Sequence, residues 1–285
     1  MSAAAAPAAQ EPRTSGSRRI TFPRVLRSEL IKTTTVPSTV ILLAVALAVM
    51  VGLGALVAWS AVETARDPAM GAAMGVDDGS LRRLAYEVPS SGLPFGQLLI
   101  ASLAVVVMAS EYSTGMIRAT MTAVPARTPA LLAKTLVITV ISFALGVLAA
   151  FASYLVAQPV LSGEGLDFSL DTEGVLPSII NTGTVLALVA VMGVAIGALL
   201  RNTAGGVVTL VGALFVLPTI AELLSNLADW VDDAARFLPS NAGLQLVAIN
   251  IQDGQLNQVQ GGLVLAAWAA VLLAGAALAV KKRDV

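Results

Sequence analysis

Six long stretches without a charged residue constrain the fold of this chain more than any other feature. They are residues 33–62, 88–110, 135–163, 174–200, 202–221 and 254–280. About 20 apolar residues in a helix cross the hydrocarbon core of a bilayer, and each stretch is at least that long. Because the backbone must satisfy its own hydrogen bonds inside lipid, such stretches become helices. The sequence therefore predicts an all-α, polytopic membrane protein with a bundle of six transmembrane helices.

The predicted spans cover about residues 37–59, 93–110, 134–157, 178–200, 204–223 and 260–280. The fifth lies in the shortest uncharged stretch, and Pro218 near its end lacks the N–H that a helix uses for its hydrogen bonding. Small residues recur in the spans, and Gly193 with Gly197 forms a pair that lets neighbouring helices approach closely. We expect this pair to serve packing within the bundle.

Composition excludes most catalytic chemistry. Only 12% of the 285 residues are charged, about half the share in soluble domains. Cysteine and histidine are absent, which excludes disulfides, thiolate nucleophiles and imidazole metal sites. No phosphate-binding G-x-x-x-x-G-K-[ST] motif and no G-x-S-x-G motif occurs, and the six stretches contain no aspartate pair for intramembrane proteolysis. We therefore expect no enzyme, and no catalytic, cofactor-binding or metal-binding residue in this chain.

The distribution of basic residues predicts the orientation. Placing both termini in the cytoplasm puts thirteen of the 17 lysines and arginines inside and only four outside. The four outer residues are Arg66, Arg82, Arg83 and Arg236. Because inner loops of membrane proteins carry the excess of Lys and Arg, the sequence predicts an N-in/C-in topology.

Short amphipathic helices are predicted at both membrane surfaces. Residues 1–19 are rich in Ala, Pro and Ser and are predicted to be a disordered cytoplasmic tail, with the membrane domain covering 20–285. Directly before the first span, an inner-surface helix is predicted with Phe22, Val25, Leu26 and Leu30 on one apolar stripe and basic residues on its other faces.

Of the outer loops, residues 61–92 form either a small cap or a mobile loop. Residues 224–258 contain an apolar pattern that predicts one amphipathic helix, lying either at the outer interface or as a solvated helix packed on the bundle. The residues of that pattern are Leu223, Leu227, Trp230, Val231, Ala234 and Phe237.

The segment from Ala109 to Lys134, between the second and third spans, carries the most informative pattern. Its charges and prolines exceed what a short connector needs. A helix after Gly115 would place Met116, Ile117, Thr120 and Met121 on one face, and Pro125 would turn the chain towards the third span. This predicts a short surface helix with an exposed apolar stripe, which suits docking of a protein partner.

At these residues the chain resembles the membrane subunits of type-2 ATP-binding cassette (ABC) exporters. Those subunits often carry a glutamate after the second span, a glycine about four residues later, a hydrophobic-basic helix, and then proline, arginine and lysine. The matching residues here are Glu111, Gly115, Ile117, Arg118, Pro125, Arg127 and Lys134. The six-span layout, the basic surface helix and the ending AVKKRDV extend the resemblance over most of the chain, whereas the long first outer loop departs from it.

The resemblance implies that residues 20–285 are an ABC transporter-type transmembrane domain in a cell membrane, with a bacterial plasma membrane expected. It implies a permease subunit that forms the pathway as a homo- or heterodimer and exports a drug, lipid or amphipathic compound. A separate ABC ATPase subunit, which binds ATP with Mg, would be its partner. No nucleic-acid partner is expected, and membrane lipids surround the spans.

The resemblance also implies that the loop after the second span couples the ATPase to the helices. Met116, Ile117, Thr120 and Met121 would dock on the ATPase, and Arg118 and Arg127 would pair with its acids or with lipid phosphates. Glu111 would cap the loop helix or pair with Arg118 or Lys134. For Arg127 and Lys134, the alternative is that each is an ordinary inner-surface anchor.

Two other functions stay open at this point. The chain is alternatively a membrane scaffold or assembly protein without transport activity, whose loop binds a partner that is not an ATPase. A secondary transporter is disfavoured because no ionisable residue lies in the middle of a predicted span, where a coupling ion would be bound.

Overall fold

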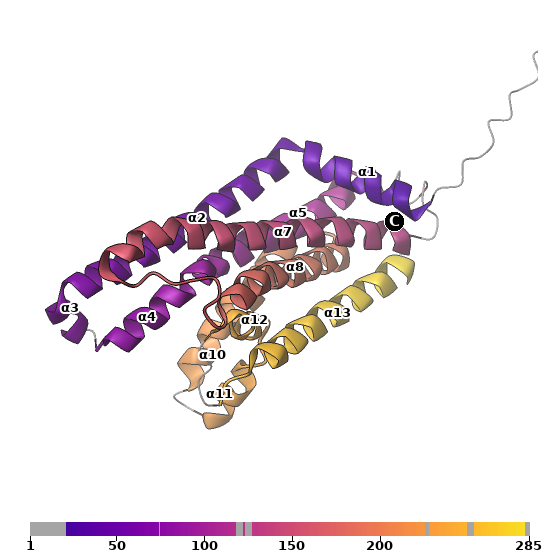
Figure 1. The fold of residues 1–285 in the computed structure, drawn as a ribbon. Helices are drawn as coiled ribbons and strands as arrows, with labels where there is room; N and C mark the ends of the chain where they lie inside the picture. Colours follow the sequence, from indigo (N-terminus) through magenta and orange to yellow (C-terminus); the bar gives the residue numbers. More distant parts are fainter. Residues whose placement is uncertain are drawn as a thin grey trace, which may run out of the picture.

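A computed structural model describes residues 21–73, 75–117, 122, 127–225, 228–249 and 254–282. All regular elements in these ranges are helical, and six of the helical segments are long and apolar enough to cross a membrane. They lie side by side in an elongated bundle (Figure 1). The prediction of an all-α polytopic bundle is confirmed.

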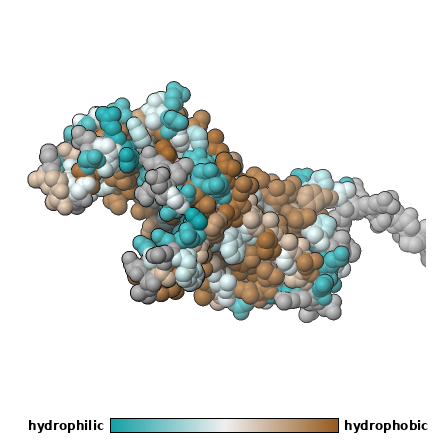
Figure 2. Space-filling view, turned by 90° about the horizontal axis from the view of Figure 1, so that it is seen from below, coloured by the Kyte–Doolittle hydropathy of each residue, from teal (hydrophilic) through white to brown (hydrophobic). Residues whose placement is uncertain are grey.

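Each predicted span falls within one of these six segments. They are α2 (Pro37–Arg66), α5 (Leu93–Ser113), α7 (Thr128–Leu161), α8 (Val175–Leu200), the continuous run α9–η3–α10 (Thr203–Val211, Gly212–Val216 and Leu217–Ser225), and α13 (Gln258–Lys282). The apolar side chains form a broad surface around the middle of the molecule, and hydrophilic side chains gather towards its ends (Figure 2).

The fifth span continues through Pro218 by a local change of helix type. Residues Gly212–Val216 form a π-helical segment directly before the proline-containing α10. Proline cannot donate the hydrogen bond of a regular turn, and a wider turn is a known way to accommodate such an interruption. The span therefore reaches Ser225 in spite of its proline.

Helix α8 is the centre of the bundle. It packs against α5, α7, α9, α12 and α13, and most of its residues from Ser178 to Ala198 are buried. Gly193 and Gly197 face α5, as expected for packing within the bundle. A Cβ atom added at Gly193 would lie 2.6 Å from the Cβ of Ala104, so the two helices touch there through their backbones.

The two ends of the bundle differ. Helix α1 (Phe22–Thr35), the end of α5, the start of α7 and the end of α13 gather at one end, which we call the α1 end (Figure 1). Helices α3 (Pro68–Ala73) and α4 (Asp78–Glu87) lie at the opposite end, which we call the α4 end. The charge bias predicts that the α1 end is cytoplasmic.

The first outer loop is a folded cap. Asp77 caps α4 by accepting a hydrogen bond from the backbone N–H of Ser80. Leu81 and Ala85 of α4, with Val88 of η1 (Val88–Ser90), are buried in a second hydrophobic core with side chains of α7 and of the loop that contains η2 (Ser162–Glu164). Of the two alternatives left open by the sequence, the structure has the cap.

The third outer loop differs from the single amphipathic helix that was predicted. Its apolar pattern begins with Leu223 in α10 and continues in a separate short helix, α11 (Asp229–Ala235), where Trp230 is exposed and Val231 is buried. Leu227 lies outside the described residues. A further helix, α12 (Pro239–Val247), was not predicted because nine residues are too short to span. It lies against α8 and α13, where Ser178 Oγ donates to the carbonyl of Val247 at 2.8 Å.

Helix α1 has the predicted location in sequence but a different buried face. Val25, Glu29 and Thr33 are buried, and the helix packs against α7. Phe22 and Leu30 of the predicted apolar stripe are exposed. The buried face carries a carboxylate, Glu29, which pairs with Lys134 of α7 and with Lys32 of α1 itself.

The contact at Gly193 generates a test of the packing. Gly193→Ala should destabilise the protein by about 1–3 kcal/mol, because the new methyl group overlaps Ala104 and the helices must move apart. Gly52→Ala in α2 is the matched control, since a Cβ there meets nothing within 4 Å and alanine is the better helix former. Thermal unfolding in mild detergent measures both, and equal melting temperatures for the two variants would contradict the close approach.

Candidate functional site

The segment after α5 turns sharply at Gly115. Ser113 ends α5, and Gly115 has a φ of +72°, a backbone conformation that glycine adopts without steric cost. Its N–H donates to the carbonyl of Tyr112, which closes the helix end. Of the predicted site residues, Arg118, Thr120, Met121 and Pro125 lie outside the described residues.

Met116 and Ile117 do not share an exposed face. Met116 is 48% exposed, whereas Ile117 is only 3% exposed and belongs to the main hydrophobic core of the bundle. The prediction that Ile117 contributes to an exposed docking stripe is therefore wrong. Successive residues of a helix point in different directions, so the exposure of Met116 does not extend to Ile117.

The predicted residues Glu111 and Lys134 meet in a buried charge cluster that also contains Glu29 and Lys32 of α1. Lys134 Nζ lies 2.9 Å from Glu111 Oε1 and 2.6 Å from Glu29 Oε2. Lys32 Nζ lies 2.6 Å from Glu29 Oε1 and 3.3 Å from Glu111 Oε1. Each lysine thus contacts both glutamates, and the four side chains close a ring that joins α1, α5 and α7.

Three members of the charge cluster are almost completely buried. Glu29, Glu111 and Lys134 each expose 5% or less of their surface, and Lys32 lies at the edge. Of the partners predicted for Glu111, the structure has Lys134. Lys134 is not an ordinary surface anchor, because its ammonium is buried between two carboxylates.

Pairing decides the charge state of the α1 residues. Burial alone would raise the pKa of Glu29, but the charges and hydrogen bonds of Lys134 and Lys32 outweigh burial and hold its pKa below the ordinary value. Burial alone would lower the pKa of Lys32, and the hydrogen bond to Glu29 with the charge of Glu111 raises it instead. The lowered pKa of Glu29 and the raised pKa of Lys32 both favour the charged forms of these two side chains.

Sequence reasoning missed Glu29 and the role of Lys32. A signal was present, because Glu29 is the only acidic residue between Glu11 and Glu63, in a helix that is otherwise basic. With the predicted topology, Glu29 and Glu111 are the only two inner acids within the described residues, and both belong to the charge cluster.

Two further contacts tie the ends of this loop to the rest of the α1 end. The guanidinium of Arg201, which follows α8, lies over the ring of Tyr112 at 4.9 Å. Arg127 directly precedes α7, and its Nη1 donates to the carbonyl of Val280 near the end of α13 at 3.5 Å. The segments flanking the loop therefore contact α1, the α8–α9 connection and α13.

The charge cluster ties three helices together through ion pairs. Its two carboxylates are each neutralised by two lysines, and no group of three or more carboxylates gathers elsewhere in the described ranges. No protein-family model matches the chain, and no curated protein matches its sequence.

Removing one lysine of the charge cluster should show how much the cluster contributes to the stability of the fold. Lys134→Met should destabilise the protein by about 3–5 kcal/mol, because it leaves buried carboxylate charge with one cation fewer. Adding Glu29→Leu should recover part of this loss, since it restores charge balance. Lys281→Met, at an exposed position near the end of α13, is the matched control and should change stability little. Unfolding in mixed micelles measures all three, and a Lys134→Met variant as stable as the control would contradict the account.

The lowered pKa of Glu29 predicts an acid-sensitive step in stability. A group with a depressed folded pKa stabilises the fold above its unfolded value, ordinarily near 4.5, and this contribution is lost as the pH falls through the lower folded value. Melting temperatures measured across this range should fall with acid more steeply for the natural chain than for Glu29→Gln, which lacks the titrating group. Parallel pH profiles for the two proteins would overturn this assignment.

Proposed function

We propose that this chain is the membrane-spanning permease subunit of a type-2 ABC exporter, driven by a separate ATPase that binds ATP with Mg. The observation that carries the proposal is the set of contacts around the loop between α5 and α7. The segments flanking that loop are joined to α1 by the charge cluster, to the α8–α9 connection through Arg201, and to α13 through Arg127.

These contacts suit a loop that receives force from a partner. The ion pairs of 2.6–3.3 Å resist separation, because Glu29, Glu111 and Lys134 are buried and an unpaired charge at a buried position is costly. A displacement of the loop would therefore move α1, α5 and α7 together. A connector with no mechanical role needs none of these constraints.

Met116 supplies an apolar contact for the partner. It is half exposed next to Gly115, at the end of the bundle where the charge bias predicts the cytoplasm. An exposed methionine beside basic residues suits a groove on an ATPase with acidic neighbours. Ile117 is excluded from this contact by its burial.

The pathway itself is proposed to form between two copies of the permease or between this chain and a related one. The fifth span, α9–η3–α10, is the span least covered by the rest of the chain. Val208, Val216 and Leu223 are among its exposed side chains, so an apolar surface of lipid or of a second subunit must cover it. We propose a cell-membrane location and export of a drug, lipid or amphipathic compound.

Affinity purification of the tagged protein in mild detergent, followed by an ATP hydrolysis assay, tests this function. An ATPase subunit should co-purify with the natural chain. Met116→Glu should weaken that association at least about ten-fold, the loss of one interface hot spot, and should leave the melting temperature unchanged because Met116 is exposed.

Met116→Leu is the matched control and should retain the ATPase, because the side chain stays apolar and of similar size. Recovery of the protein with a partner that does not hydrolyse ATP would favour the scaffold function and overturn the proposal. Equal ATPase retention by Met116→Glu and Met116→Leu would exclude Met116 from the contact.

A further inference from the structure

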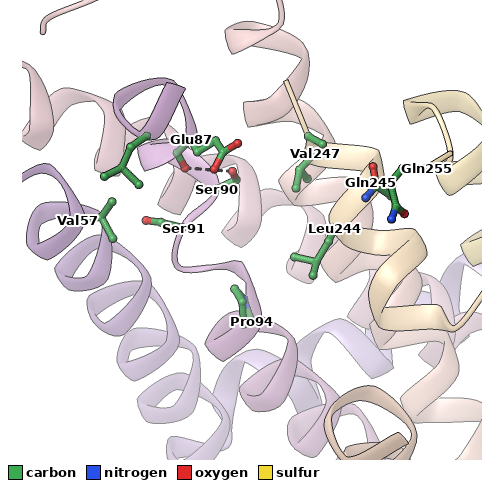
Figure 3. Close-up of a pocket in the computed structure, with 11 residues that line it drawn as sticks. Val57, Glu87, Ser90, Ser91, Pro94, Leu244, Gln245, Val247 and Gln255 are labelled. Carbon is green, nitrogen blue, oxygen red and sulfur yellow. Dashed lines mark hydrogen bonds between the residues drawn. The ribbon is translucent and has the colours of Figure 1, made fainter. Parts of the chain in front are cut away.

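A cavity of about 420 Å³ opens at the α4 end of the bundle, far from the charge cluster. Its volume lies within the range of small-molecule sites. On one side it is bounded by η1 and the start of α5, and on the other side by α12 (Figure 3). Its walls combine apolar and polar side chains. The apolar ones include Val57, Leu84, Pro94, Leu244 and Val247.

Two serine hydroxyls in the cavity wall already donate their protons to carbonyls of the chain, so each can only accept a hydrogen bond from a ligand. Ser90 Oγ donates its proton to the carbonyl of Glu87 at 3.1 Å, and Ser91 Oγ donates to the carbonyl of Val88 at 2.8 Å. Both hydroxyl oxygens therefore retain only lone pairs for a ligand. Gln245, across the cavity, has a buried Oε1 that accepts no hydrogen bond from the described residues.

Glu87 adds a negative charge at this cavity. The described residues that line it include no lysine or arginine, and none of them places a cation within ion-pair distance of the Glu87 carboxylate. Figure 3 shows Glu87 and the two serines on the side of the cavity opposite Gln245. A ligand between these sides meets an anion and an unpaired amide oxygen at once.

We propose that this cavity binds an organic ammonium ion that carries an apolar body. The N–H groups of the ammonium would donate to the Glu87 carboxylate, and Gln245 Oε1 would accept a hydrogen bond from another donor group of the ligand. The hydrocarbon part would lie against Leu84, Pro94 and Leu244. Anions are disfavoured because the described lining residues include the Glu87 carboxylate and no lysine or arginine.

The cavity narrows the substrate class of the proposed exporter. Because the α4 end is predicted to be the outer end, an amine bound there would be a compound leaving the protein, and this interpretation rests on the proposed function. The binding site itself rests only on the geometry of the cavity. Experiments can therefore test the binding site and the proposed exporter function separately.

Fluorescence titration of the purified chain with monodansylcadaverine tests the site. This probe has a primary ammonium on a flexible alkyl chain and an apolar fluorophore whose emission rises on burial. Its N-acetylated form is the matched neutral ligand. The natural chain should bind the amine at least about ten-fold more tightly than the acetylated form, the difference expected for a charge-assisted hydrogen bond.

Three variants assign that preference to the cavity. Glu87→Gln should reduce the preference for the amine over its acetylated form to less than about three-fold. Gln245→Leu should also weaken binding of the amine. Asp167→Asn removes one exposed acid from the loop after η2, outside the cavity lining, and should preserve the preference. Equal melting temperatures of the variants verify that each is folded.

Each outcome decides the inference. Similar affinities for the amine and its acetylated form, or an undiminished preference in Glu87→Gln, would overturn it. A preference lost equally in Asp167→Asn would also overturn it, because general surface charge would then explain the binding. Because no ATPase is present in the titration, amine binding by a chain that recruits no ATPase would keep this site while rejecting the exporter function.

Discussion

Two acidic and two basic side chains meet at one end of the bundle, three of them buried, and set the geometry on which the rest of the structure depends. A carboxylate or an ammonium removed from water is tolerated only when opposite charges and hydrogen bonds compensate for the lost solvation. Glu29, Lys32, Glu111 and Lys134 satisfy this condition only together, because each lysine contacts both glutamates. Helix α1 must therefore lie against the junction of α5 and α7, and the loop between those helices must begin and end at this point.

Because the spans are closely packed, the position of the charge cluster affects the arrangement of the whole bundle. Helix α8 touches most other spans, and at Gly193 its backbone lies directly against α5. Helices in such contact move as units, since separating them leaves voids without partner atoms. A force applied near Gly115 would thus be carried along α5 and α7 and into their neighbours. In the function that we propose, the loop would receive the force that drives a transport cycle.

The acidic side chains of the charge cluster and Glu87 at the opposite end of the bundle differ in whether they are paired with basic side chains. At the α1 end, the buried acids are neutralised within the protein. At the α4 end, Glu87 and Gln245 line a cavity, and no described residue donates a hydrogen bond to the carboxylate of Glu87 or to Gln245 Oε1. The first arrangement holds helices together, and the second is suited to a ligand. We therefore propose mechanical coupling at the α1 end and recognition of a cationic compound at the α4 end.

By itself the sequence determined the six spans, because their length and lack of charge leave no other structure in a bilayer. It also indicated the Glu111–Lys134 pairing as one of three alternatives. Only the tertiary structure decided that Glu29 completes the charge cluster and that Ile117 is buried. It likewise decided that the first outer loop folds as a cap and that α12 lies against α8 and α13. These features depend on contacts between residues far apart in the chain, whereas hydropathy and helical spacing report only on neighbours in sequence.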